Sequence, residues 1–420
     1  MKKLALAAGA FSLAALFAGP AFAVTELSMW YHGAGNKEER AVLATIIEDF
    51  NKSQGDWAVK LQEFPQAAYN DSVTAGALAK KLPDILDVDG PNMPNWAWAG
   101  YMAPLDLPAG ATDKFLPGPI GKWQGKFYSV GLWDAAVAIV TRKSTLDAYG
   151  IRVPTLDKPW TADEFEAGLQ KIKAGGKFQY PLDLGMAWKG EWYPYAFSPL
   201  LQSFGGDIID RKAYKTAEGV LNGPDAVKFG SWWQHLFTDK LAPGTSQDPA
   251  DRDSGLISGK YAMAWNGNWA ALGVIAKFGD DTLFLPAPDF GHGSKIGAAS
   301  WQFGVSAQSA HKDGAAKFIA FALQDKYLTA FSDQSGLIPP TPDSAAASKN
   351  YKKGGPMEVF YNLSKSQALV RPVTPGYIVD AKVFEKALAD IANGAKVQDT
   401  LDAAATEINA DIEKNKGYGF

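Results

Sequence analysis

The chain contains no cysteine among its 420 residues. Disulfide bridges, thiolate metal ligands, a cysteine nucleophile and a lipid anchor attached through cysteine are therefore excluded. Histidine is scarce as well, at four residues, and none of them has the spacing of a paired metal site. The serine elbow motif of hydrolases and the Walker A phosphate loop are also absent. We therefore expect no metal and no other cofactor, and no motif points to an enzyme.

Only one long apolar run occurs, and it lies at the amino end. Lys2 and Lys3 precede the uncharged residues 4–18, and residues 21–23 supply the small-x-small sequence that signal peptidase reads. The run is shorter than the roughly 20 residues that span a bilayer. The pattern therefore predicts a cleavable signal peptide, residues 1–23, and a freely soluble protein in the periplasm.

The remaining chain is moderately acidic. Without Lys2 and Lys3, 39 basic residues stand against 45 acidic ones, a formal charge of −6. This balance argues against a nucleic-acid partner. A chain of this length forms about two domains and can bury large cores without cross-links. We expect a monomer.

The order of the predicted elements indicates α/β domains. The first part alternates between strands at 25–31, 59–64 and 85–88 and helices at 37–51 and 69–82. This alternation predicts a mostly parallel sheet that is covered by helices. In such sheets ligands bind at the carboxyl ends of the strands.

The rest of the chain follows the same logic. Strands are expected at 135–141 and 261–265 and helices at 161–174 and 226–237, before a mainly helical last hundred residues. Thr161 and Glu164 resemble a capping box at the start of one of these helices.

Aromatic residues are abundant, with 14 tryptophans, 15 tyrosines and 23 phenylalanines. A flat ring can cover the apolar face of a sugar, while polar side chains bond its hydroxyl groups. Trp269 and Trp301 stand beside glycine or small polar residues and are interpreted as pocket residues. Tyr193 and Asn266 lie in similar aromatic, polar segments and join the candidate ligand residues.

Four charged residues are further candidates. Asp87 and Asp89 follow a predicted buried strand, where a carboxylate can accept two hydroxyl groups through charge-assisted bonds. The alternative for this pair is a turn or a helix cap. Asp134 is either a ligand at the hinge or a strand-end residue. Arg371 offers a planar fork to hydroxyls, a carboxylate or a sulfonate, and otherwise is a surface arginine.

Several ordered segments resemble the family 1 extracellular solute-binding proteins, the group that includes maltose-binding protein. The resemblance covers residues 24–420. It rests on Pro83-Asp84-Ile85 after a helix, Gly125 to Val130, Phe204 to Asp207, Gly259 to Met263, Ser335 to Pro339 and the closing amphipathic helices.

The resemblance implies two α/β lobes joined by a hinge, the type II periplasmic binding protein fold. Residues 24–134 and 287–340 would form the first lobe, and residues 135–286 and 341–420 the second. A carbohydrate would be held between the lobes and handed to the membrane permease of an ABC transporter. Matched by position, the implied ligand residues are Trp30, His32, Asp87 or Asp89, Asp134, Trp269, Arg371 and Tyr377.

Two other interpretations stay open. Carboxylates beside tryptophans also suit a glycosidase, with Asp87 and Asp89 as its acid and nucleophile. Alternatively, the same fold could bind an acidic or sulfonated sugar at Arg371, or a polyamine or iron. Iron would need clustered tyrosines or histidines, which the sequence does not indicate.

Overall fold

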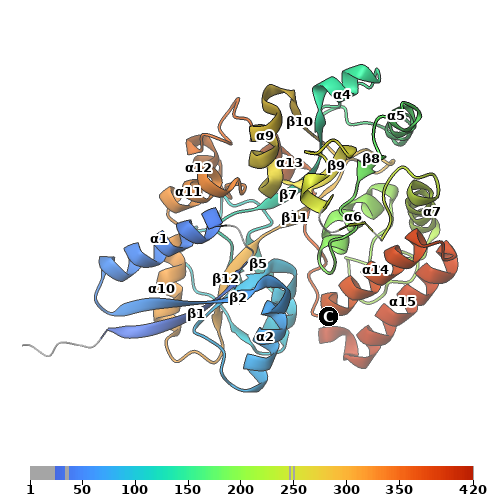
Figure 1. Ribbon diagram of the computed structural model, residues 1–420. Helices are drawn as coiled ribbons and strands as arrows, with labels where there is room; N and C mark the ends of the chain where they lie inside the picture. The colour runs from blue at the N-terminus through green and yellow to red at the C-terminus, as the bar shows by residue number, and fades with distance from the viewer. Residues whose placement is uncertain (1–23, 34–36, 246, 249–250, 420) are drawn as a thin grey trace, which may run out of the picture.

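Two β-sheets, each covered by helices, form two lobes, which lie at the lower left and the upper right of Figure 1. The computed structural model describes residues 24–33, 37–245, 247–248 and 251–419, and the expected signal peptide, residues 1–23, lies outside them. The two-lobed α/β fold is confirmed. Among the described residues, no helix combines the length and the apolar character needed to cross a bilayer.

The first sheet has the strand order β2-β1-β3-β12-β6-β5, and β4 also pairs with β12. Strands β1 (Thr25–Gly33), β2 (Trp57–Pro65) and β3 (Ile85–Asp89) are parallel. Helices α1 (Lys37–Ser53) and α2 (Gln66–Leu78) connect them, as the sequence predicts. The antiparallel strands are β4 (Met102–Ala103), β5 (Ile120–Trp123), β6 (Lys126–Val130) and β12 (Trp301–Ser306).

The second sheet has the order β13-β11-β7-β9-β8, and β10 also pairs with β7. Its central strand, β7 (Ala135–Arg142), is buried along almost its whole length. The other strands are β8 (Tyr180–Asp183), β9 (Tyr261–Gly267), β10 (Thr282–Leu285), β11 (Ile296–Ala299) and β13 (Ala368–Leu369).

Both sheets are mixed, whereas the sequence predicted mostly parallel sheets. Strand β7 carries the chain out of the first lobe, and the consecutive strands β11 and β12 carry it back. A returning strand runs opposite to the strands that led outward, so β11 is antiparallel to β7 and β12 is antiparallel to β3. The alternation of helices and strands in the sequence does not reveal this return.

Three crossing segments lie side by side between the lobes. The Ser300 hydroxyl donates to the Trp133 carbonyl at 2.6 Å, and Asp134 and Ile338 exchange backbone hydrogen bonds of 2.8 and 2.9 Å. By sheet membership the chain returns to the first lobe at Ser300, because β11 belongs to the second sheet. The sequence-based division at residue 287 places β11 in the first lobe.

Helices cover both sheets. Helix α1 packs against α11 and α10 in the first lobe, and α7, α14 and α15 pack together in the second. The α-helices not yet given are α3 (Met93–Trp98), α4 (Lys143–Ala148), α5 (Ala162–Ala174), α6 (Trp192–Phe204), α7 (Pro224–Thr238), α8 (Asp251–Ser254), α9 (Ala271–Phe278), α10 (Lys312–Ala322), α11 (Asp325–Ser335), α12 (Pro342–Ala347), α13 (Glu358–Ser366), α14 (Tyr377–Ala392) and α15 (Val397–Lys414). The short 3-10 helices are η1 (Gly90–Asn92), η2 (Asn268–Ala270), η3 (Gly279–Asp281) and η4 (Lys416–Gly419).

Local sequence signals explain several of these elements. The buried side of α1 includes Val42, Ile46 and Phe50, the four-residue repeat on which its prediction rested. The capping box of α5 is present, since the Thr161 hydroxyl accepts from the Glu164 backbone N–H and the Glu164 carboxylate accepts from the Thr161 backbone N–H. Each lobe therefore follows its hydrophobic pattern and has its own core.

Trp233 on α7 tests the core of the second lobe, because it is fully buried and its indole N–H donates to the Leu388 carbonyl at 3.0 Å. We expect Trp233→Ala to lower the free energy of unfolding by about 3–5 kcal/mol, since it opens a large cavity. Leu78→Ala removes a side chain that is 78% exposed and should change it by less than about 0.5 kcal/mol. Urea unfolding followed by circular dichroism measures the stability of both variants. Equal losses of stability would contradict the burial of Trp233 in the core of the second lobe.

Candidate ligand-binding site

The carboxyl ends of β1 and β3 bring His32 and Asp87 together. Their side chains are joined by a hydrogen bond of 2.5 Å from Nδ1 to Oδ2, and both are fully buried. Trp301 at the start of β12 stacks on the imidazole, with ring centroids 3.6 Å apart and planes 6° apart. The sequence named all three as candidates, and they meet because neighbouring strands end at one edge of the sheet.

Charge holds this group together. Burial alone would lower the pKa of His32, but the charge and hydrogen bond of Asp87 outweigh it and raise the pKa. Burial raises the pKa of Asp87, and His32 opposes that shift. Since both side chains lie below the surface, they orient the face of Trp301 from beneath.

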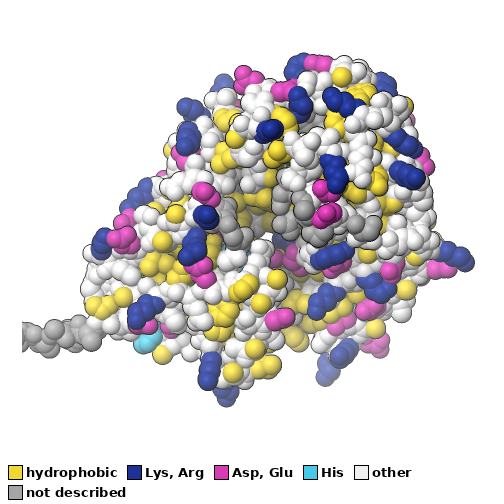
Figure 2. All heavy atoms as spheres, viewed as in Figure 1, with side chains coloured by type: hydrophobic (Ala, Val, Ile, Leu, Met, Phe, Trp, Pro, Cys, Tyr) yellow, Lys and Arg dark blue, Asp and Glu magenta, His cyan; other side chains and the backbone are white. Residues whose placement is uncertain are grey.

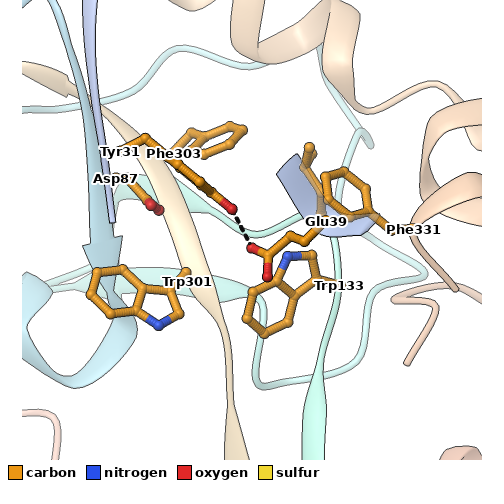
Figure 3. Close-up of a pocket in the computed structure, with 8 residues that line it drawn as sticks. Tyr31, Glu39, Asp87, Trp133, Trp301, Phe303 and Phe331 are labelled. Carbon is orange, nitrogen blue, oxygen red and sulfur yellow. Dashed lines mark hydrogen bonds between the residues drawn. The ribbon is translucent and has the colours of Figure 1, made fainter. Parts of the chain in front are cut away.

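A small cavity lies behind this group, and Figure 3 shows the side chains around it. Its volume is about 10 Å³, room for roughly one water molecule. The Tyr31 hydroxyl donates to Glu39 Oε1 at 2.6 Å beside it, and Asp87 and Trp133 also line it. The cavity is too small for a sugar.

A second polar group forms where the lobes meet. Arg371 Nη1 donates to Glu191 Oε2 at 2.6 Å, and the Tyr377 hydroxyl donates to the same oxygen at 2.6 Å. Arg371 Nη2 lies 3.6 Å from Asp89 Oδ1. Asp89 ends β3 in the first lobe, whereas Arg371, Glu191 and Tyr377 pack with the second. The guanidinium therefore links the two lobes.

Burial shapes the protonation of this group. Burial raises the pKa of Asp89 to about 7, and Arg371 opposes the shift. Burial alone would lower the pKa of Arg371, but Tyr377, Asp89 and Glu191 outweigh it, so the guanidinium stays charged. The buried, paired guanidinium of Arg371 is therefore held in place where the lobes meet.

Helix α6 contributes two residues that the sequence did not single out, Glu191 and Tyr195. Glu191 is the N-cap of α6, and Tyr195 follows one turn later on the same face. The aromatic ring of Tyr195 lies 5.2 Å from the Arg371 guanidinium, and its buried hydroxyl has no hydrogen-bond partner. The aromatic segment is evident in the sequence, but Pro194 and Pro199 argue against a helix there, so the sequence does not predict the four-residue spacing of Glu191 and Tyr195.

Tyr193, which the sequence did name, is not part of this group. It is fully buried in the second lobe, where its hydroxyl donates to the Met186 carbonyl at 3.4 Å and its ring meets Phe197 edge-on. Tyr193 and Tyr195 are two positions apart on α6, and side chains with this spacing lie on different faces of a helix.

Aromatic rings surround Tyr195. Between ring centroids, Trp269 lies 6.2 Å from Tyr195 and 5.7 Å from Trp188, and Trp188 lies 4.3 Å from Trp192. Trp269 folds back over Gly267, where an added Cβ would lie 2.1 Å from its ring, so only glycine fits there. The role of Trp269 beside the ligand stays a prediction.

Three other candidates remain, and one of them, Asp134, lies close enough to Tyr195 that its charge adds to burial in raising the pKa of the Tyr195 hydroxyl. Asn266 is buried near the end of β9, and its side chain accepts from the Gly267 backbone. Trp30 packs beside Phe64 at 4.8 Å and covers Gly76 of α2. Asp134 is fully buried among the crossing segments, where burial raises its pKa to about 7.

The contact between the lobes therefore combines ring faces with unused hydrogen-bonding groups. Arg371 Nε and the Tyr195 hydroxyl are buried without a partner. Such an atom costs about 1–3 kcal/mol unless water or a ligand satisfies it. Figure 2 shows a hollow between the two lobes. A site of this kind, at the junction of two α/β lobes, defines a two-lobed ligand-binding protein.

The comparison with known families agrees with this class. Residues 45–358 match the family model described as bacterial extracellular solute-binding protein, and the chain belongs to this family. The resemblance on which the sequence analysis relied is confirmed. Members of this family are binding proteins.

Individual relatives are distant but cover most of the chain. The mannitol-binding protein of Pseudomonas aeruginosa is 25% identical over 91% of this chain and 92% of its own length. The multiple sugar-binding protein of Streptococcus mutans is 24% identical over 71% of this chain and 72% of its own. The cyclic α-maltosyl-1,6-maltose binding protein of Arthrobacter globiformis has the same fold, with a TM-score of 0.77 and 22% identity over 93% of this chain and all of that structure.

Asp134 provides a pH test of the crossing segments. Its pKa rises from about 3.9 in the unfolded chain to about 7 in the folded protein. The folded state thus binds this proton more tightly, so stability is lost as the pH rises between these values. We therefore compare the free energy of unfolding of Asp134→Asn with that of the natural protein by urea unfolding. The difference should favour the variant by about 2–3 kcal/mol more at pH 8 than at pH 5.

An exposed carboxylate serves as the control for this comparison. Asp163→Asn on α5 should follow the pH dependence of the unchanged protein, because Asp163 is exposed. If Asp134→Asn showed the same pH dependence of stability as the unchanged protein, the buried carboxyl group of Asp134 would not be the source of that dependence.

Proposed function

We propose that this protein captures a carbohydrate between its lobes and delivers it to the membrane permease of an ABC transporter. The observation that carries this proposal is the junction of the lobes, where Tyr195 and Trp269 offer ring faces beside the unpartnered Arg371 Nε and Tyr195 hydroxyl. Sugars combine apolar faces with polar rims, which this mixture of groups matches. The names of the sugar- and mannitol-binding relatives support the same class of ligand.

Capture would work by closure of the lobes about the crossing segments. A ligand bound to one lobe gains contacts with the other only when the lobes approach, so it shifts the population toward a closed form. We propose that the permease recognises this form, and that the protein acts as a periplasmic monomer after removal of residues 1–23. Its family of extracellular solute-binding proteins supports export.

We further propose that the protein is not a glycosidase. Asp87 is bonded to His32, and Asp89 lies against Arg371, so neither carboxylate is arranged as a free acid or nucleophile. Incubation with oligosaccharides should give binding heat without product.

A thermal-shift screen against maltose, maltotetraose, D-mannitol and D-tagatose tests the function. A ligand at 100 times its dissociation constant stabilises the native state by about 2.7 kcal/mol, so the melting temperature should rise by several degrees with at least one of these compounds. Isothermal titration calorimetry then gives the stoichiometry, which should be one. The absence of any shift across a wider set of sugars and polyols would reject carbohydrate capture.

Two tyrosines on α6 form a matched pair for locating the site. Tyr195→Phe removes the unpartnered hydroxyl and should weaken binding of the sugar identified in the screen by about three- to tenfold. Tyr193→Phe removes a hydroxyl that points to Met186 in the core and should leave the affinity unchanged. Calorimetry measures both, and the reverse order would place the ligand on the other face of α6.

A further inference from the structure

Arg371 already has carboxylate partners within the protein. Nη1 is bonded to Glu191 at 2.6 Å, and Nη2 faces Asp89 at 3.6 Å. The Tyr377 hydroxyl donates to the same Glu191 oxygen and holds that carboxylate in place. We call these three residues, Arg371, Glu191 and Asp89, the ion triad.

An acidic ligand would need the groups that the triad uses. Arginine binds a carboxylate or sulfonate best through two parallel N–H bonds. Nη1 of Arg371 is bonded to Glu191 and Nη2 lies within ion-pair distance of Asp89, while the buried Nε has no hydrogen-bond partner. Nε–H alone is enough for a hydroxyl group, whereas an anion that uses the fork of Nε and Nη2 would have to displace Asp89 from Nη2.

The surrounding charge points the same way. Glu191 already balances the guanidinium of Arg371, and Asp89, whose pKa burial raises to about 7, adds a second negative charge as it ionises. A carboxylate on the ligand would therefore meet no unmatched positive charge in the triad and, once Asp89 is ionised, net repulsion. The imidazole of His32 is bonded to Asp87, so a carboxylate of the protein already matches its charge. A neutral hydroxyl group avoids this repulsion and can still satisfy Arg371 Nε.

We infer that Glu191 and Asp89 are specificity-determining residues, which occupy Arg371 and so make the site accept neutral sugars and reject their acidic counterparts. This inference rests on the proposed function and decides between a neutral ligand and an acidic or sulfonated one. The discrimination comes from carboxylates that the protein places around its own arginine.

Matched neutral and acidic probes test this inference by isothermal titration calorimetry. The pairs are D-glucose with D-glucuronate and D-galactose with D-galacturonate, in which a carboxylate replaces the neutral hydroxymethyl group and the ring is kept. The natural protein should bind the neutral member of at least one pair about tenfold or more tightly than the acidic member. The variant Glu191→Gln/Asp89→Asn frees both Nη atoms and should bind the acidic member at least about tenfold more tightly than the natural protein does.

A variant of equal net charge controls for long-range effects. Glu218→Gln/Asp163→Asn removes two exposed carboxylates from the second lobe and should not change the preference between the members of a pair. Circular dichroism and the melting temperature verify that each variant is folded. Should the triad variant not fold, Tyr377→Phe, which only releases Glu191, should shift the preference in the same direction by a smaller factor.

The possible outcomes separate this inference from the proposed function. If the natural protein binds glucuronate or galacturonate as tightly as the neutral partner, carbohydrate capture stands and the selection against acids is overturned. If a folded triad variant gains no affinity for the acids, the role of Glu191 and Asp89 is wrong. If none of the four probes binds, and none of the sugars in the wider screen, the proposed function fails and the inference fails with it.

Discussion

A buried guanidinium must be paired, and this requirement organises the junction between the lobes. Arg371 comes from the late part of the chain, Glu191 from the start of α6 and Asp89 from the end of β3, and the three meet because an unpaired buried charge is too costly. Their contact fixes which faces of α6 and β3 point into the junction. It also determines that Tyr195 and Trp269, rather than Tyr193, lie beside the open hydrogen-bonding groups.

The crossing segments provide the second constraint. The chain leaves the first lobe through β7 and returns through β11 and β12, so each sheet contains strands of both directions. Bonds from Ser300 to Trp133 and between Asp134 and Ile338 keep the segments together. This arrangement keeps two separate cores on either side of the crossing segments.

Much of the fold was predictable from local patterns. The repeat of Val42, Ile46 and Phe50, the capping box at Thr161 and the alternation of strands and helices depend on residues close in sequence, and the structure has these elements. Helix α6 was missed, because its two prolines and its burial on nearly all sides remove the amphipathic pattern on which such predictions depend. Glu191 and Tyr195 were missed with it.

The sequence by itself determined the class of fold, the resemblance to solute-binding proteins and the choice of His32 and Asp87 as candidates at the ends of neighbouring strands. Only the tertiary structure decided which aromatic rings face the junction, that the sheets are mixed, and that Arg371 is already occupied by carboxylates. The physical reason is that periodicity and capping act over a few residues, whereas charge pairing and ring contacts join segments that are distant in the chain.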